Sequence, residues 1–161
     1  MLIRQGVVPQ QWFHPMRIRT FERRDLLSVL RMANEHAFFD GPTSEEDLEI
    51  TKDFPQGFIV AEERGEIVGF AYGYFRDVPS AVLEKWGVTK VATIELLVVK
   101  PEYRSRGIGT ELMESLMLIL KGAGADLIGL HCPIQATEAK RLYERLGFET
   151  SAYHMKRRLD A

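Results

Sequence analysis

A glycine-containing loop between an apolar strand and an amphipathic helix restricts the possible folds of this chain more than any other segment. The apolar run Ile94–Val99 leads into the loop Arg104-Ser105-Arg106-Gly107-Ile108-Gly109, and helical spacing follows over about 110–121. A loop of this kind presents backbone N–H groups at the N-terminus of a helix, where anions bind favourably. Its glycines let a ligand approach the main chain closely, and Arg104 and Arg106 add positive charge. The segment therefore predicts a binding site for a phosphate-rich ligand.

Two other phosphate-binding motifs do not fit the spacing of this loop. A dinucleotide-binding Gly-x-Gly-x-x-Gly motif would need glycine at Leu112. A mononucleotide loop would need Lys and then Ser or Thr directly after Gly109, where Thr110 and Glu111 stand. The usual dehydrogenase and kinase signatures are therefore missing, and an ordinary glycine-containing turn before a helix is the alternative interpretation.

Length and charge restrict the class of protein. A chain of 161 residues suits one domain with a single core, which we expect over 16–161, with 1–15 as an N-terminal extension. The net charge is −2 and both signs are interspersed, so we expect no nucleic-acid partner. The apolar runs are shorter than the roughly 18 residues of a membrane-spanning helix. With one cysteine and no signal-peptide pattern, we expect a cytoplasmic protein with no membrane partner.

The periodicity of apolar residues predicts an α/β protein of the α+β type. Strands are expected at 17–20, 58–63, 67–75, 91–99 and 127–132 and from 148 toward 158, and helices at about 24–38, 110–121 and 135–146. A capping box at Ser44 begins a further short helix, and Arg64-Gly65-Glu66 closes a hairpin. This order predicts a mixed central sheet of about six to seven strands, flanked by about four helices.

The order of these elements, together with two motifs, resembles the GNAT superfamily of N-acetyltransferases. The loop matches the family's Gln/Arg-x-x-Gly-x-Gly/Ala motif, which binds the acetyl-CoA pyrophosphate, and residues 139–148 match its Ala-x-x-Leu-Tyr-x-x-x-Gly-Phe segment. The resemblance implies an acyltransferase of the EC 2.3.1 class that transfers acetyl from acetyl-CoA to a primary amine, by direct attack in a ternary complex. The amine would belong to a peptide N-terminus, a lysine or a small molecule. The implied cofactor-binding residues are Arg104, Ser105, Arg106, Gly107, Ile108, Gly109, Thr110 and Tyr143, with the backbone of Leu97, Val98 and Val99.

Transfer of an acetyl group from a thioester to an amine needs a base for the ammonium proton and a proton donor for the leaving thiol. Glu95 lies within an apolar strand, where burial would favour a protonated carboxyl, and the resemblance makes it the first candidate base. His131 is the second, because imidazole suits proton transfer near neutral pH. The resemblance implies that Tyr143 protonates the departing thiolate. The alternatives are a Glu95 that is solvent-facing or ion-paired, a His131 packed in the core and a Tyr143 that is only a core aromatic.

The acceptor amine is expected to meet the first helix pair and the loop expected over 76–90, before the central strand. Phe38, Asp40, Glu84 and Trp86 supply aromatic walls and carboxylates for a cationic amine, although packing on the core would explain them equally well. The scattered histidines have no paired ligand spacing, so we expect no metal.

A non-catalytic module is the alternative function. Relatives often carry Asn where Ala136 stands, so one contact to the cofactor is lost or replaced. This departure would suit a GNAT fold that only senses acyl-CoA.

The final strand also offers a way to form an oligomer. Pairing of this strand across a two-fold axis would form a homodimer.

Overall fold

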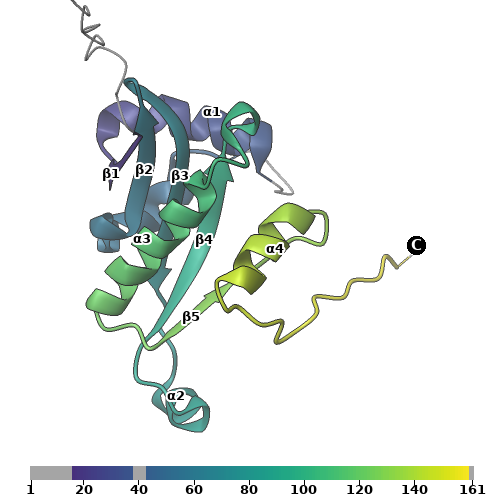
Figure 1. Ribbon diagram of the computed structural model, residues 1–161. Coiled ribbons are helices and arrows are strands. Elements are labelled where there is room, and N and C mark those ends of the chain that lie inside the picture. The colour runs from purple at the N-terminus through teal and green to yellow at the C-terminus, as the bar shows by residue number, and fades with distance from the viewer. Residues whose placement is uncertain (1–15, 38–42, 160–161) are drawn as a thin grey trace, which may run out of the picture. The chain divides into compact units, whose positions relative to one another are not determined.

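The computed structural model describes residues 16–37 and 43–159. They form two compact units that divide after His131 (Figure 1). The first unit contains a sheet and three α-helices, and the second contains helix α4 (Thr137–Arg145). The expected extension 1–15 lies outside the described residues, and a single domain over 16–161 stays a prediction.

Five strands form the sheet in chain order. They are β1 (Arg17–Thr20), β2 (Phe58–Glu63), β3 (Glu66–Phe75), β4 (Val91–Val99) and β5 (Leu127–Leu130). The pairs from β1 to β4 are antiparallel, and β5 runs parallel to β4. The mixed sheet predicted from the sequence is therefore confirmed. Arg64 and Gly65 join β2 to β3 with φ values of 52° and 78°, as a tight hairpin turn requires.

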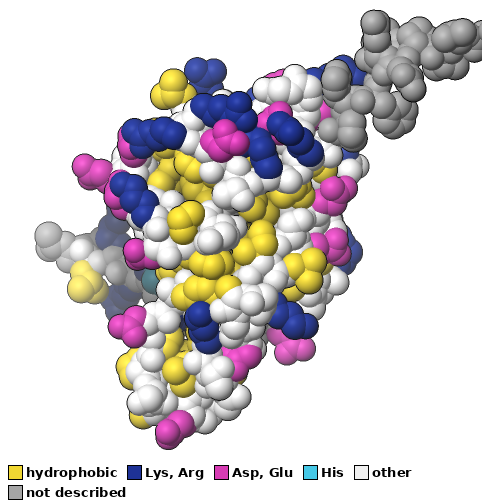
Figure 2. Space-filling view, turned by 90° about the vertical axis from the view of Figure 1, so that its left-hand side faces the viewer, with side chains coloured by type: hydrophobic (Ala, Val, Ile, Leu, Met, Phe, Trp, Pro, Cys, Tyr) yellow, Lys and Arg dark blue, Asp and Glu magenta, His cyan; other side chains and the backbone are white. Residues whose placement is uncertain are grey.

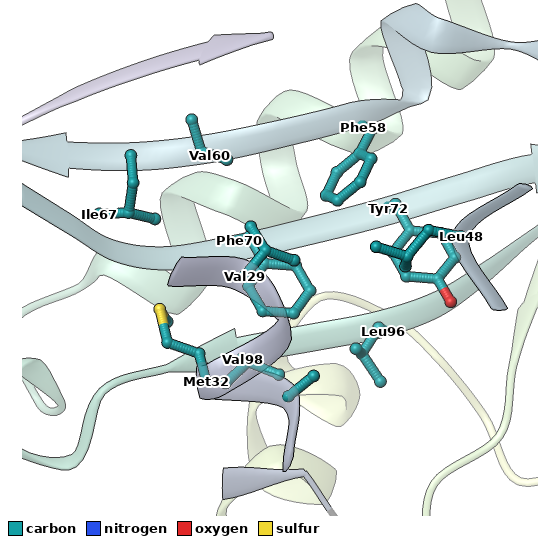
Figure 3. Packing of buried hydrophobic residues seen from close by; sticks show 11 residues of the cluster. Val29, Met32, Leu48, Phe58, Val60, Ile67, Phe70, Tyr72, Leu96 and Val98 are labelled. Atoms are coloured by element: carbon teal, nitrogen blue, oxygen red, sulfur yellow. The ribbon is translucent and has the colours of Figure 1, made fainter. Parts of the chain in front are cut away.

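Helices cover both faces of the sheet (Figure 1). On one face α1 (Leu26–His36) and the 3-10 helix η3 (Glu46–Asp53) pack against β2, β3 and β4 (Figure 3). The buried side chains of this layer are Val29, Met32, Ala33, Leu48, Phe58, Val60, Ile67, Phe70, Tyr72, Leu96 and Val98. On the other face lies α3 (Ile108–Gly122), which packs closely because β3 presents glycines there. A Cβ on Gly69 would come within 3.1 Å of Leu112 Cδ1.

A partly buried ion-pair network attaches β1 to the start of α1. Arg19 donates to both carboxylate oxygens of Asp25, at 2.7 and 2.9 Å, and to Glu62 on β2 at 2.7 Å. Burial alone would raise the pKa of Asp25, but its hydrogen bonds from Arg19 and from the backbone N–H of Glu22 lower it below its usual value. The network therefore holds the first helix in register with the sheet.

Two segments differ from the prediction. Helix α2 (Ser80–Trp86) forms within 76–90, which was expected to be a loop. The segment from 148 toward 158 forms no strand among the described residues, so the sheet has five strands instead of six to seven. A strand forms only where a sheet edge pairs with it, and the side chains over 151–159 are exposed.

The surface carries charged side chains of both signs. On the face shown in Figure 2, Lys and Arg side chains lie among Asp and Glu side chains around a stretch of hydrophobic side chains. Over 16–37 and 43–159, no helix is long and apolar enough to cross a lipid bilayer.

Candidate active site

Glu95 occupies a β-bulge in the middle of β4. Tyr72 pairs with Leu96 and Gly73 pairs with Ile94, so Glu95 is an extra residue without a partner on β3. A bulge redirects the side chain of the extra residue. Glu95 is accordingly exposed between two buried neighbours, and its Oε2 accepts a hydrogen bond from the Tyr74 hydroxyl at 3.1 Å. The expectation of a buried carboxylate is therefore wrong, because the bulge turns the side chain toward solvent.

Glycines allow the backbone to pack tightly beside this bulge. A Cβ on Gly73 would lie 2.8 Å from the carbonyl oxygen of Thr93, and one on Gly57 would lie 2.4 Å from the carbonyl oxygen of Gly73. Real Cβ atoms do not come so near to backbone oxygens, so a larger residue at either position would push the strands apart. The position of Glu95 thus depends on the residues that face its strand.

Two tyrosines of β3 lie near Glu95. Burial, followed by the negative charge of Glu95, raises the pKa of both Tyr72 and Tyr74. Tyr74 therefore remains a hydrogen-bond donor to the carboxylate at neutral and moderately alkaline pH.

The edge of β4 opens directly after the bulge. Pairing with β5 ends where Ile94 meets Leu130, and in the described part of the chain no strand pairs with that edge of β4 beyond this point. Backbone groups on an open edge can bind an extended ligand. Leu97, Val98 and Val99 lie on this stretch, and their contact with a cofactor stays a prediction. His131 follows Leu130 and is exposed, so the two candidate bases lie beside the point where β4 and β5 separate.

The loop before α3 has the geometry of an anion site. Ser105 and Gly107 both adopt left-handed backbone conformations, with φ values of 59° and 84°. No side chain caps the N-terminus of α3. The first backbone hydrogen bond of the helix runs from the N–H of Glu111 to the carbonyl oxygen of Gly107. The N–H groups of residues 108–110 therefore have no acceptor within the helix and are available to an anion. Pyrophosphate fits this donor set.

Helix α4 ends in a motif that orients Tyr143. The N–H groups of Gly147 and Phe148 donate to the carbonyl oxygens of Glu144 and Tyr143, at 3.1 and 3.0 Å, and Gly147 has a φ of 89°. This is a Schellman cap, in which the residue after the glycine packs on the last turn. The Phe148 ring accordingly lies edge-to-face with Tyr143, at 6.0 Å between centroids. The Leu-Tyr-x-x-x-Gly-Phe segment thus encodes a helix end that holds the tyrosine ring.

The environment of Tyr143 keeps its phenol protonated. Tyr143 belongs to the half-buried stripe of α4, whose other members are Ala139, Leu142 and Leu146, as periodicity predicts. Burial, with the nearby Cys132 thiol, raises the pKa of Tyr143 to about 12. Burial also raises the pKa of Cys132, which disfavours the nucleophilic thiolate.

The sequence pattern of the Acetyltransferase (GNAT) family matches residues 23–148, which include the loop, the bulge and the helix-end motif. The chain belongs to this acetyltransferase family.

Two curated acetyltransferases are similar in sequence to this GNAT protein. Mycothiol acetyltransferase from Thermobispora bispora is 33% identical over 142 residues, which cover 83% of this chain and 46% of that protein. An N-alpha-acetyltransferase from Sulfurisphaera tokodaii is 30% identical over 110 residues, which cover 63% of this chain and 62% of that protein. The chain thus spans about half of the first relative and less than two thirds of the second.

Solved structures confirm the GNAT fold. Ard1 from Thermoplasma volcanium superposes with a TM-score of 0.71 and 25% identity, over 85% of this chain and 84% of that one. The aminoglycoside N-acetyltransferase AAC(6')-Iy, solved with CoA, gives a TM-score of 0.69 at 19% identity, over 99% of this chain and 100% of that one. The second likeness is one of fold alone.

The residues predicted to meet the acceptor amine lie apart in the chain. Phe38 and Asp40 lie outside the described residues. Glu84 and Trp86 are exposed on α2, at the end of the sheet where β4 begins, whereas the loop over 104–109, called the phosphate loop below for its predicted ligand, follows the opposite end (Figure 1). Their contact with an acceptor stays a prediction.

Tyr74 is a neighbour of Glu95 that the sequence pattern of this GNAT protein did not predict. The two residues meet because of a register shift between β3 and β4, and no local pattern shows such a shift. Two tyrosines two residues apart on β3 were the available signal, since both must point to one face of the sheet.

Proposed function

We propose that the protein is an acetyl-CoA-dependent N-acetyltransferase that acts by direct attack of a primary amine in a ternary complex. Family membership supports the use of acetyl-CoA, and the donor set at the N-terminus of α3 suits its pyrophosphate. When bound, acetyl-CoA supplies the activated acetyl group.

The observation that carries this proposal is the course of β4. One rigid strand leads from the exposed carboxylate of Glu95, along the open edge at Leu97–Val99, to the phosphate loop. Glu95 and Val99 are separated by about 13 Å of strand. A ligand that uses both ends must therefore have its reactive group far from its phosphates, as acetyl-CoA does.

Glu95 is the proposed base, and the hydroxyl of Tyr74 positions it. An acceptor amine is protonated at neutral pH and must lose a proton before it attacks. An exposed carboxylate at the mouth of the open edge can take that proton directly or through water. The backbone N–H groups over Leu97–Val99 would polarise the carbonyl that is attacked. His131 is the second candidate for the base.

Tyr143 is the proposed donor to the leaving sulfur. As the new carbon–nitrogen bond forms and the carbon–sulfur bond breaks, negative charge develops on sulfur. A phenol with a pKa of about 12 is a weaker acid than a thiol, whose pKa is about 8.5, so it acts mainly as a hydrogen-bond donor to that charge. The phenol keeps its proton, and the released thiolate takes the proton that neutralises it from solvent.

The relatives suggest two classes of acceptor. One is named as a mycothiol acetyltransferase and another as an N-alpha-acetyltransferase, so both small amines and peptide N-termini belong in a first screen. The acceptor of this chain is proposed to come from one of these classes.

Thiol release from acetyl-CoA tests the proposed function. The purified protein is assayed against peptides with varied N-termini, lysine peptides, polyamines and amino sugars. Release that depends on one class of amine would support the transferase and identify the acceptor. Binding of CoA without release across the whole panel would favour the acyl-CoA sensor, for which the small side chain of Ala136 at the start of α4 is the one favourable observation.

A further inference from the structure

The two arginines of the phosphate loop have different partners. Arg106 faces Glu63 at the end of β2, with its two terminal nitrogens 2.7 and 3.4 Å from the carboxylate oxygens. Its guanidinium also lies over the Tyr103 ring, at 5.3 Å from the centroid. Arg104 donates from Nε to the carbonyl oxygen of Val99 at 3.0 Å. Within 16–37 and 43–159 neither of its terminal nitrogens has a hydrogen-bond partner, so both can meet a ligand.

A second carboxylate of the same hairpin supports this arrangement. Glu66, at the start of β3, accepts hydrogen bonds from Lys100 and from the Tyr103 hydroxyl, the latter at 3.3 Å. The bond from Lys100 lowers the pKa of Glu66, so the carboxylate stays charged at neutral pH. The ring that lies beneath Arg106 is therefore itself held by the hairpin.

Glu63 is better shielded from solvent than Arg106. The Glu63 side chain is 16% exposed and that of Arg106 is 49% exposed. A carboxylate with so little access to water needs its partner, whereas the outer edge of the guanidinium remains hydrated. The pair therefore fixes the loop to the hairpin more than it presents a free charge to a ligand.

We propose that Arg106 is an anchor, not a phosphate ligand, and that Glu63 is a positioning residue for acetyl-CoA. The β2–β3 hairpin, through Glu63 and the Tyr103–Glu66 contact, holds the loop so that the N–H groups of residues 108–110 and the free end of Arg104 converge on the phosphates. The affinity for the cofactor then depends on a carboxylate that does not touch it. This inference rests on the proposed use of acetyl-CoA.

The anchor makes a distinct set of predictions for CoA binding, measured by isothermal titration calorimetry. Removing the direct ligand in R104Q should weaken CoA binding about 10- to 100-fold. Breaking the anchor in E63Q or in R106Q should weaken it about tenfold, because the loop loses one charge-assisted contact. The double variant E63Q/R106Q should be no weaker than either single variant, since both changes remove the same contact.

The charge-reversed pair E63R/R106E separates an anchor from a ligand. If Arg106 anchors the loop, the reversed pair forms the same contact, and CoA affinity should return to within about threefold of the wild type. E114Q, on the exposed face of α3, is the control for loss of one carboxylate and should leave CoA binding unchanged. Thermal unfolding of each variant shows that the fold is retained.

Three results would overturn the inference. The first is a loss of CoA affinity in R106Q that E63R/R106E does not restore. The second is a loss of CoA affinity in R106Q that is much larger than the loss in E63Q. The third is tighter CoA binding by E63Q, which would mean that Glu63 competes with the phosphates. Failure of the wild-type protein to bind CoA would instead contradict the proposed function. The decisive comparison is therefore the CoA dissociation constant of E63R/R106E beside those of R106Q and the wild type.

Discussion

The hydroxyl of Tyr74 lies 3.1 Å from Oε2 of Glu95, across the register shift between β3 and β4. The contact joins the carboxylate at the bulge to a half-buried ring that packs against the core under α1. It restricts an otherwise exposed carboxylate to one orientation. This contact supports the proposal that Glu95, among the acidic residues of the sheet, is the base.

Removing this hydroxyl should slow acetyl transfer without unfolding the protein. In Y74F the carboxylate loses the hydrogen bond that positions it, so kcat should fall about tenfold. The KM for acetyl-CoA should stay the same. An unchanged kcat would show that Tyr74 only packs.

Replacing the carboxylate itself tests the base. E95Q should lower kcat by about 100-fold or more, because general base catalysis contributes at least that much, and CoA should bind as before. H131A is measured beside it. If E95Q keeps the wild-type rate while H131A loses it, His131 is the base and the assignment of Glu95 is wrong.

The contribution of Tyr143 to kcat should be the same at every pH from about 6 to 10. Its pKa of about 12 keeps the phenol protonated across this range, so Y143F should lower the rate about 10- to 100-fold by a factor that does not change with pH. The measurement is the ratio of kcat values for the two proteins at each pH. A ratio that fell toward one below pH 10 would mean that the phenol ionises earlier than its surroundings indicate.

The stability of the paired strands β3 and β4 at the bulge should depend on Gly73, the glycine that faces it. G73A places a Cβ 2.8 Å from the carbonyl oxygen of Thr93 and 3.2 Å from Leu120 Cδ1, so the free energy of unfolding should fall by about 1–3 kcal/mol. G129A is the matched control, because a Cβ on Gly129 meets nothing within 4 Å. Chemical denaturation measures both variants. Equal stabilities would show that β3 and β4 adjust at no cost.

The Arg19–Asp25 pair should account for part of the acid sensitivity of the fold. The pKa of Asp25 is lowered, so the pair stabilises the folded protein above the usual carboxyl pKa, and this stabilisation is lost as the pH falls through the lowered value. D25N should therefore cost about 3 kcal/mol at pH 7, and its difference from the wild type should shrink below about pH 4. A difference that stayed constant down to pH 2 would contradict this account.

Much of the fold could be predicted because each element has its own local signal. The hairpin turn at Arg64-Gly65 needs two left-handed residues, and β4 is a continuous β-branched and leucine-rich run, so both were placed correctly. The helix α2 was missed because it is short and ends at Gly87, inside a segment with turn residues. The expected last strand has no partner among the described residues, and pairing is a property that no local pattern contains.

The candidate site was only partly predictable, for a similar reason. Residues 104–109 could be predicted from a sequence motif, and Tyr143 from the motif that ends its helix. The exposure of Glu95, its contact with Tyr74 and the bond between Arg106 and Glu63 all depend on which residues face each other across strands far apart in the chain. Sequence spacing does not determine those pairings.

Mass spectrometry of the acceptor is the measurement closest to the central claim. The wild-type protein is incubated with acetyl-CoA and a mixture of peptide and small-molecule amines, and with acetyl-CoA alone. Direct transfer predicts that one amine class gains a single acetyl group, that free CoA appears in equal amount and that the protein stays unmodified without amine. Acetyl-CoA that binds but remains intact with every amine would contradict the claim.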